Sequence, residues 1–339
     1  MNYIEKKPSM ENHLKQSIPH KKRQIQEQNN PKNIIYTDKS SFEEKLSNFI
    51  DSYYHDKKSV AIVTDFDYTL TSRIDYKTGK LYHSSYYLYD EDIIGGDQKT
   101  FDQRRQALAD KYALYEFSTS YDIETRKIKM KEWYTKSLEL YFNEKFTADS
   151  VDEMVHKTKN NLLLRRKAIE YLELLMNLGI TVVIESGGIG DFIRSYLKIY
   201  LPNFERYLSE KKIIIVSNMF TFNNKAGCVG LEHEVINCFN KADFLGNVVN
   251  EELPELKHVM VLGDNLSDAD SIKKINVPKE NVIGFGFLNL PNDIINDETK
   301  KDYLQKKINE NKKVFDMTLL GDCDYEPIIE ILKNIRVHN

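Results

Sequence analysis

Apolar residues occur along the chain in two patterns that indicate two kinds of secondary structure. Short runs rich in β-branched residues are apolar at nearly every position, at 60–65, 180–185, 212–217, 258–263, 282–287 and 314–319. Longer segments with helical spacing separate most of these runs. Continuous apolar strands alternating with helices are typical of a parallel sheet that is covered on both faces. The pattern predicts an α/β fold with a doubly wound, Rossmann-like parallel sheet.

The interval between the first two runs is long and mostly helical in pattern. Amphipathic spacing covers 99–117, 126–142 and 151–179. We interpret this interval as a helical cap inserted into the sheet-bearing core. The predicted domains are an α/β catalytic core at 41–74 and 166–339 and a helical cap domain at 75–165.

The N-terminal segment differs in composition from the rest of the chain. Residues 1–40 are rich in Asn, Gln and Lys, with a basic cluster at 20–24 and almost no apolar periodicity. This composition predicts a disordered polar and basic tail. A role of the basic cluster in localisation or partner binding is the alternative. We expect the first helix to begin at Ser41, which can cap it, with Glu44 three residues later.

Composition narrows the class of protein. The 339 residues carry a net charge of −4, with 41% hydrophobic and 29% charged residues. This balance is typical of a globular protein and argues against a general nucleic-acid binder. The three cysteines, Cys228, Cys238 and Cys323, lack CxxC spacing, so neither a disulfide framework nor a zinc site is expected. No membrane-length apolar run and no signal core are present, so a cytoplasmic protein without membrane association is predicted.

Two carboxylates follow the first strand pattern directly. The stretch VAIVTDFDYTLTS at 60–72 ends its apolar run in Asp65, Phe66 and Asp67. Like charges two residues apart at a strand end repel one another, and the chain itself offers little to neutralise them there. We therefore expect ligands from outside the chain, namely Mg²⁺ and a phosphate ester.

Three further stretches place polar residues at or near predicted strand ends. VVIESGGIGD carries Ser186, Gly187, Gly188 and Gly190; INCFNKAD carries Lys241; VMVLGDNLSDAD ends in Gly263 and Asp264, then Asp268. In open parallel sheets, ligands bind outside the carboxyl ends of the strands. These stretches are therefore expected to meet Asp65 at one edge of the sheet.

Together the four stretches resemble the motifs of the haloacid dehalogenase superfamily of phosphotransferases. The chemistry suits each position: Asp65 can attack phosphorus as a nucleophile, and Asp67 can act as general acid and base. Ser186 and the backbone N–H groups of the glycine-rich turn can hold phosphate oxygens. Lys241 can offset the charge of the phosphate and the nucleophile. Asp264 can bind Mg²⁺ together with the Asp65 carboxylate, since Mg²⁺ prefers one or two carboxylates plus waters and substrate oxygens.

Simpler explanations exist for each motif taken alone. DFDYT can be a turn with an Asx hydrogen bond, and GDNLSD can be a helix cap with Asp264 and Asp268 at the surface. Lys225 in NNKAG is the alternative to Lys241 as the cation. All four motifs in order, each at its place in the α/β pattern, favour the catalytic interpretation.

A closer resemblance covers about 45–335. EWYTKS at 132–137, SNMFTFN at 217–223, INCFNK at 236–241 and LGDNLSDADS at 262–271 are similar to the cytosolic pyrimidine 5′-nucleotidase family, also called cytosolic 5′-nucleotidase III. The resemblance implies Mg²⁺-dependent hydrolysis of nucleoside 5′-monophosphates through an aspartyl-phosphate. It assigns Mg²⁺ to Asp65, the Asp67 carbonyl and Asp264. It assigns phosphate to Ser186, Gly187 and Lys241, with Asp268 in support.

The same resemblance assigns the base to the cap. Glu116 matches the glutamate that accepts from the polar edge of the base, Ser137 lies in the nucleotide pocket, and Trp133 falls where the family stacks an aromatic ring. Trp133 as part of the cap core, and Glu116 as a solvated helix charge, are the alternatives. Tyr86 replaces a histidine of some members, and an aromatic pair with Trp133 would suit a cationic 7-methylguanine through cation–π contact.

The resemblance leaves several functional questions open. Glu185 stands where the family typically has Phe, which adds a carboxylate beside the phosphate site. Pyrimidine nucleotides such as CMP and UMP, and 7-methyl-GMP, both remain candidate substrates, and phosphate transfer to a nucleoside acceptor is a possible side activity. A small-molecule phosphatase with a non-nucleotide substrate and a catalytically weak nucleotide-binding regulator are the alternative functions. A monomer is expected.

Overall fold

The computed structural model describes residues 33–336 except 95–97, 119 and 143–144. These described residues belong to one compact unit. The boundaries predicted for core and cap, at 75 and 165, stay a prediction. Most of the predicted tail, residues 1–32, lies outside the described residues. Among the described helices, none combines the length and the apolar character needed to cross a membrane.

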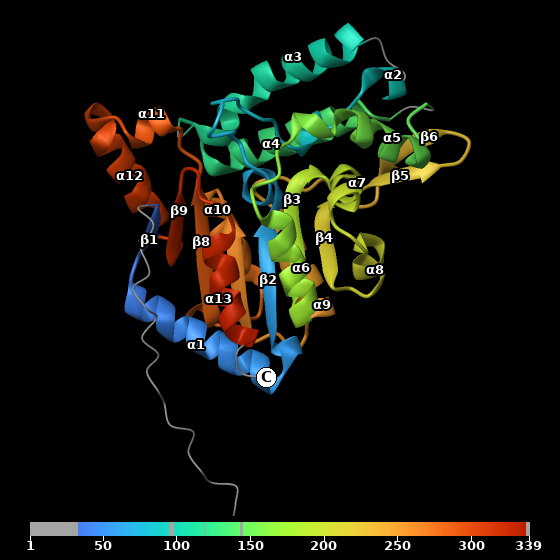
Figure 1. Ribbon diagram of the computed structural model, residues 1–339. Helices are drawn as coiled ribbons and strands as arrows, with labels where there is room; N and C mark the ends of the chain where they lie inside the picture. The colour runs from blue at the N-terminus through green and yellow to red at the C-terminus, as the bar shows by residue number, and fades with distance from the viewer. Residues whose placement is uncertain (1–32, 95–97, 119, 143–144, 337–339) are drawn as a thin grey trace, which may run out of the picture. The chain divides into compact units, whose positions relative to one another are not determined.

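A seven-stranded sheet forms the centre of the fold, as the sequence pattern predicts (Figure 1). Its strands run in the spatial order β1 (Ile34–Tyr36), β9 (Met317–Leu320), β8 (Val282–Leu288), β7 (His258–Gly263), β2 (Val60–Asp65), β3 (Thr181–Ile189) and β4 (Ile213–Asn218). All neighbours pair in parallel except β1, which is antiparallel to β9. The doubly wound α/β class is therefore confirmed.

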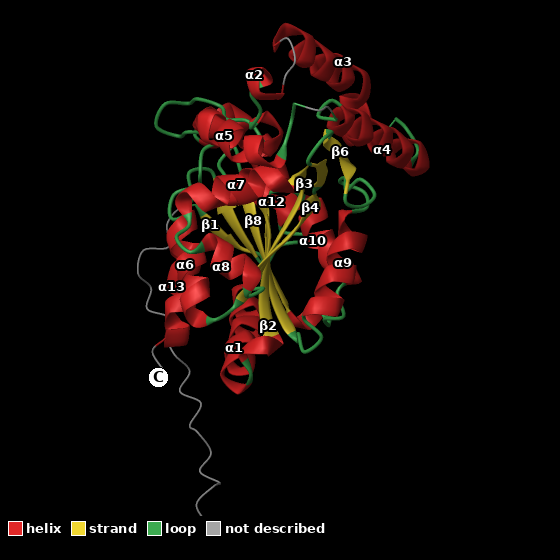
Figure 2. Cartoon of the chain, turned by 90° about the vertical axis from the view of Figure 1, so that its right-hand side faces the viewer, coloured by secondary structure: helices red, strands yellow, loops and turns green. Residues whose placement is uncertain are grey.

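The strands alternate their side chains between two separate apolar layers. Ile62 of β2 packs into the layer that contains Phe49 of α1 (Lys39–His55). Ala61 and Val63 face the other layer, which contains Leu245 of α9 (Lys241–Glu252). Because neighbouring residues of a strand point to opposite faces, a fully buried strand needs apolar residues at every position. Figure 2 shows the sheet edge-on with helices on both sides.

The remaining core helices cover these faces or connect the strands. They are α6 (Ala168–Leu178), α7 (Gly190–Tyr200), α8 (Phe204–Ser209), α10 (Leu266–Ser271), α11 (Asn292–Ile295), α12 (Lys301–Asn311) and α13 (Glu326–Arg336). A separate two-stranded hairpin, β5 (Phe220–Asn223) and β6 (Gly227–Leu231), follows β4.

The interval between β2 and β3 contains helices at the predicted positions, namely α3 (Gln98–Phe117), α4 (Ile123–Glu139) and α5 (Ala148–Thr158). The short helix α2 (Glu91–Ile94) was not predicted. Figure 1 shows α3 and α4 beyond the carboxyl ends of the parallel strands. The third predicted amphipathic segment, 151–179, is two helices rather than one. Lys167 lies in the left-handed region at φ 63° between them, and a helix cannot continue through that conformation.

The N-terminal boundary predicted from composition is wrong by several residues. Residues 34–36 form β1, and α1 begins at Lys39 instead of Ser41. The side chain of Asp38 caps this helix by accepting from the Ser41 N–H at 3.1 Å. A three-residue strand is too short to show periodicity, so pairing with β9 rather than local sequence defines it.

Candidate active site

Three strands bring the predicted motifs to one edge of the sheet. β2 lies between β3 and β7, so the carboxyl ends of all three are neighbours. Asp65 ends β2, Ser186 lies in the last part of β3, and Asp264 follows the last residue of β7. Asp65 pairs in register with Glu185. The sheet topology thus gathers residues that are far apart in the sequence.

The turn after β2 reverses the chain sharply at Phe66–Leu70. Tyr68 takes a positive φ of 64° there, which is costly for a bulky residue and must be held by other contacts. The Arg165 guanidinium supplies them, because it donates to the carbonyls of Tyr68 at 2.6 Å and Thr69 at 2.8 Å. It also donates to the side-chain oxygen of Asn289, whose amide in turn donates to the Tyr68 carbonyl at 2.9 Å.

Asp67 projects from this turn and is held by Ser85. The Ser85 N–H donates to Oδ1 at 2.6 Å, and the Ser85 hydroxyl donates to Oδ2 at 2.7 Å. Burial raises the pKa of Asp67 to about 6, although both hydrogen bonds act to lower it. A carboxyl with a pKa near neutrality can both give and accept a proton under ordinary conditions.

Lys241 is the cation at the centre of the cluster. Its ammonium is 2.5 Å from Asp268 Oδ1, 3.8 Å from Asp65 Oδ1 and 3.9 Å from Glu185 Oε2. Burial alone would lower the pKa of Lys241, but the three carboxylates raise it well above its ordinary value. Lys225, the alternative cation, is exposed beside the β5–β6 turn.

Asp268 is built into the start of α10. It bonds Lys241 through Oδ1, and its Oδ2 accepts from the Asn265 N–H at 2.8 Å. A Cβ on Gly263 would lie 2.3 Å from the Asp268 Cβ, so only glycine lets this carboxylate approach the strand end. Asp268 therefore anchors both Lys241 and the loop that carries Asp264.

Asp65, Asp264 and Asp268 each offer one carboxylate oxygen, and these oxygens lie within 4.8 Å of one another. Burial and the neighbouring Asp268 raise the pKa of Asp65 well above its ordinary value and that of Asp264 to about 7. The Lys241 ammonium compensates these buried like charges only in part. Oxygen donors in a negative pocket fit a hard divalent cation such as Mg²⁺. Since Asp268 is already bonded to Lys241, Asp65 and Asp264 are the better placed ligands.

The glycine turn at the end of β3 is fixed from several sides. Ser186 Oγ accepts from the Gly188 N–H at 3.0 Å. The carbonyl of Gly187 accepts from the Tyr86 hydroxyl and from the Asn218 amide, both at 2.8 Å. Asn218 further donates to the Gly188 carbonyl at 3.1 Å. The turn is thus held in place before any ligand arrives.

The predicted base-binding residues lie on the insertion, and the structure adds a tyrosine to them. Tyr134 of α4 covers the glycine turn, since its ring lies 3.4 Å from where a Gly187 Cβ would be. Tyr86 and Trp133 each meet the Tyr134 ring edge-to-face, with centroids 5.9 Å and 6.1 Å apart. Trp133 thus lies beside the ring that covers the turn.

Glu116 faces the same aromatic group. The Glu116 charge acts to raise the pKa values of Tyr86 and Tyr134, which burial raises first. Burial raises the pKa of Glu116 itself, and nearby Arg126 lowers it. Glu116 is therefore not a freely solvated helix charge. Ser137 lies one helical turn beyond Trp133 on α4.

Glu185 is the unusual member of the cluster. The residue is 1% exposed, and its Oε1 has no hydrogen-bond partner among the described residues. Burial raises the pKa of Glu185, and Lys241 lowers it only in part. An extra buried carboxylate next to Ser186 weakens the attraction of the site for an anion.

Sequence reasoning missed three residues of this site, namely Ser85, Tyr134 and Arg165. Ser85 and Tyr134 adjoin the predicted Tyr86 and Trp133, so helical and turn geometry could have raised them as candidates. Arg165 reaches the turn from 96 residues away in the sequence, and no local pattern marks it.

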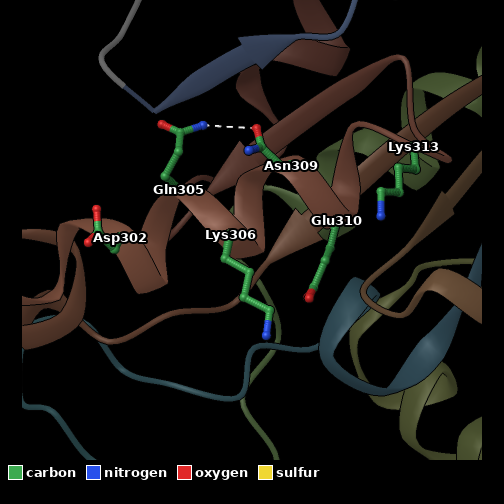
Figure 3. A pocket seen from close by; sticks show the side chains of 6 residues that line it. All are labelled: Asp302, Gln305, Lys306, Asn309, Glu310 and Lys313. Carbon is green, nitrogen blue, oxygen red and sulfur yellow. Dashed lines mark hydrogen bonds between the residues drawn. The ribbon is translucent and has the colours of Figure 1, made fainter.

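A hollow of about 390 Å³ lies on the surface along α12, away from the carboxylate cluster (Figure 3). α12 supplies its charged and amide side chains from Asp302 to Glu310, and Lys313 follows the end of the helix. Gln305 donates to Asn309 within it. The hollow shares no residue with the carboxylate cluster and offers no comparable chemistry.

Comparisons with known proteins identify a family model and several relatives that this chain resembles. The sequence model of the family described as "Pyrimidine 5'-nucleotidase (UMPH-1)" matches residues 68–336. The 7-methylguanosine phosphate-specific 5′-nucleotidase A of Xenopus laevis is 25% identical over 291 residues, which cover 84% of this chain and 90% of the relative. The corresponding enzyme of Drosophila melanogaster is 26% identical over 265 residues, covering 77% and 75%.

A solved structure gives the same fold. Cytosolic 5′-nucleotidase IIIB bound to cytidine superposes with a TM-score of 0.69 at 22% identity, over 91% of this chain and 95% of that one. At this level of sequence identity, the superposition shows that the two chains share a fold.

Proposed function

The chain belongs to the pyrimidine 5′-nucleotidase (UMPH-1) family, and from this premise we propose that it hydrolyses nucleoside 5′-monophosphates with Mg²⁺ through an aspartyl-phosphate. Family membership makes it a 5′-nucleotidase of the haloacid dehalogenase type. One observation supports the proposal of Mg²⁺ and an aspartyl-phosphate. The edge of the sheet that bears the glycine turn also brings together Asp65, Asp67, Asp264 and Lys241.

The proposed reaction uses the two aspartates of the first motif in succession. An Asp65 carboxylate oxygen attacks phosphorus, and the bond from phosphorus to the 5′ oxygen breaks. Asp67 gives its proton to that oxygen, and the nucleoside leaves. Asp67 then takes a proton from water, whose oxygen attacks phosphorus. The bond to Asp65 breaks, phosphate leaves, and both side chains return to their starting states.

The carboxylates fit the proposed metal. Asp65, the Asp67 carbonyl and Asp264 would hold Mg²⁺, while Asp268 positions Lys241 and the loop of Asp264. When bound, Mg²⁺ would offset the negative charge shared by the nucleophile and the phosphate. Chelation should therefore stop turnover, and added Mg²⁺ should restore it.

The phosphate is assigned to Ser186, Gly187 and Lys241. Asn218 and Tyr86 hold the glycine turn, and Ser186 Oγ accepts from the Gly188 N–H of that turn, so these groups are oriented in advance. Pre-oriented donors stabilise developing charge better than mobile ones, because they need no reorganisation during the reaction. The Lys241 ammonium supplies the positive charge next to Asp65.

The base is assigned to the insertion, with Glu116, Ser137, Trp133 and Tyr86 as the residues that meet it. The aromatic rings of Tyr86, Tyr134 and Trp133 adjoin the glycine turn, and Glu116 adds a negative acceptor to them. Relatives named for 7-methylguanosine phosphate and a neighbour bound to cytidine support both nucleotides as candidate substrates. A negative acceptor beside aromatic rings favours a cationic 7-methylguanine or a cytosine with its exocyclic amine.

A panel of substrates tests this proposal. Phosphate release with Mg²⁺ should be measured for CMP, UMP, AMP, GMP and 7-methyl-GMP, with glycerol phosphate and a sugar phosphate as non-nucleotide comparisons. We expect CMP or 7-methyl-GMP to show the highest kcat/KM. A preference for the non-nucleotide esters would contradict the assignment as a nucleotidase. If none of the esters were hydrolysed, the proposal that the protein is a phosphatase would be contradicted.

Glu116→Gln and Trp133→Ala test the base pocket with the same panel. Glu116→Gln keeps the shape but removes the charge, and we expect transition-state binding to weaken by about 1–3 kcal/mol. The loss should be larger for 7-methyl-GMP than for CMP, because only the cationic base gains from the charge. Trp133→Ala should weaken both. Unchanged efficiency and preference in both variants would place the base elsewhere.

A further inference from the structure

The carboxylate of Asp67 is bonded on both oxygens by a single residue. Ser85 is fully buried, and its N–H and its hydroxyl reach Oδ1 and Oδ2 at 2.6 Å and 2.7 Å. Ser85 begins the one-turn helix Ser85–Tyr87, in the segment that leads from β2 toward the helices of the insertion. Two donors on two oxygens fix both the position and the rotation of a carboxylate. Each oxygen keeps a second lone pair for a reacting partner.

Gly188 is fitted to this arrangement. A Cβ on Gly188 would lie 2.2 Å from Ser85 Oγ, and at 3.1 Å from Ser186 Oγ and 3.4 Å from Asp67 Oδ2. Gly188 is not among the residues with a positive φ, so its backbone would accept alanine. Glycine is therefore needed at this position because Ser85 Oγ occupies the space that the Cβ of any other residue would take.

The following residue ties the same short helix to the glycine turn. The Tyr86 hydroxyl donates to the Gly187 carbonyl at 2.8 Å. Ser85 and Tyr86 thus link the first motif to the turn that is assigned to phosphate. One short helix thereby contacts both the proton-transferring group and the turn assigned to phosphate.

We propose that Ser85 is the positioning residue of Asp67, and that residue 188 is glycine in order to admit the Ser85 hydroxyl. This inference rests on the proposed function, in which Asp67 protonates the departing 5′ oxygen. Ser85 aims the Asp67 carboxyl at that oxygen and takes no part in bond making itself. Loss of its hydroxyl leaves Asp67 free to rotate about one remaining hydrogen bond.

The role predicts a dependence on the leaving group. An alkoxide leaves phosphorus only with a proton, whereas a thiolate with a pKa of about 8.5 leaves without one. The test compares a nucleoside 5′-monophosphate with its analogue that carries sulfur in place of the bridging 5′ oxygen. The same base and the same phosphate then occupy the same site, and kcat/KM reports the steps up to departure of the leaving group.

We expect Ser85→Ala to lower kcat/KM for the oxygen substrate by about 10- to 100-fold, as for loss of a hydrogen bond to a charged group. The sulfur substrate should lose less than about threefold. Equal losses for the two substrates, or no loss for either, would overturn the inference. An inactive wild type would overturn the proposed function, and this inference with it.

A double-mutant cycle provides a test that needs only one substrate. Gly188→Ala should lower kcat/KM by about 10- to 100-fold in the wild-type background, where its methyl group displaces the Ser85 hydroxyl. In the Ser85→Ala background, Gly188→Ala should lower kcat/KM by less than about threefold. Gly230→Ala is the matched control, because no atom lies within 4 Å of its added Cβ, and it should leave activity unchanged. Equal costs of Gly188→Ala in the two backgrounds would show that the glycine serves another purpose.

Discussion

At the scale of single residues, the site contains more negative charge than one ammonium can balance. Lys241 faces Asp65, Glu185 and Asp268, and of these Glu185 makes the longest contact and leaves one oxygen without a partner. Burial raises the pKa of Glu185, so its ionised form is disfavoured in the folded state. Such a carboxyl stabilises the fold below its unfolded-state pKa, and this contribution is lost as the pH rises through its folded-state pKa.

Glu185→Gln should therefore make the protein more stable than wild type at pH 8, and about as stable as wild type at pH 5. Lys241 keeps Asp65 and Asp268, so no unpaired cation results. The KM for the nucleotide should also fall, since one anion beside the phosphate is removed. Thermal unfolding at both pH values checks the first point, with the exposed Glu280→Gln as control. A variant less stable than wild type at pH 8 would mean that the pairing with Lys241 outweighs the cost of burial.

At the scale of elements, the turn Phe66–Leu70 depends on a side chain from outside it. Arg165 is the last residue of the predicted insertion. It donates to three carbonyls of that turn and its flank and to Asn289, and its guanidinium lies 4.2 Å from the centre of the Phe287 ring. A lysine in its place would keep the charge but could not reach all these acceptors in one plane. The carbonyls it abandons would remain buried without partners.

Arg165→Lys should lower the free energy of unfolding by roughly 2–4 kcal/mol. It should also lower kcat more than it raises KM, because the turn carries Asp67. The neighbouring Arg166→Lys is the control: Arg166 is half exposed and pairs with Asp322 at the surface, so the change should cost less than about 1 kcal/mol. Denaturant unfolding of both variants measures these changes in the free energy of unfolding. Equal decreases in the two variants would show that Arg165 does not stabilise the turn more than a surface arginine does.

At the scale of the whole molecule, the sequence predicts the features that long patterns of apolar and polar residues define, namely the buried strands and the sheet topology. β2 and β7 have the expected bounds because each contains four consecutive apolar residues, Val60–Val63 and Val259–Leu262, which mark a strand buried on both faces. The gathering of Asp65, Ser186 and Asp264 follows from parallel topology alone. β1, β5 and β6 were missed because strands of three to five residues are defined by their partners. Ser85 and Tyr134 are sequence neighbours of predicted site residues and could have been raised as candidates, whereas Arg165 joins the site only through tertiary contacts, which leave no local pattern.

The two ends of the predicted tail should behave differently on truncation. Removal of residues 1–32 should leave kcat and KM almost unchanged, since every candidate site residue lies between Asp65 and Asp268. Removal of residues 1–40 also deletes β1 and the Asp38 cap, and it should lower stability by about 1–3 kcal/mol. Kinetics and thermal unfolding of both truncations check this. A large loss of kcat in the folded shorter deletion would assign the tail a role in catalysis.

The central claim is that Asp65 carries the phosphoryl group between the nucleotide and water. The most direct measurement is an acid quench of the Mg²⁺-loaded enzyme during turnover of a nucleoside 5′-monophosphate labelled in its phosphate, followed by mapping of the labelled peptide. The account predicts a hydroxylamine-sensitive label on Asp65, absent without Mg²⁺ and absent from Asp65→Asn, which should also lose turnover while remaining folded. A label on another residue, or wild-type turnover by Asp65→Asn, would contradict it.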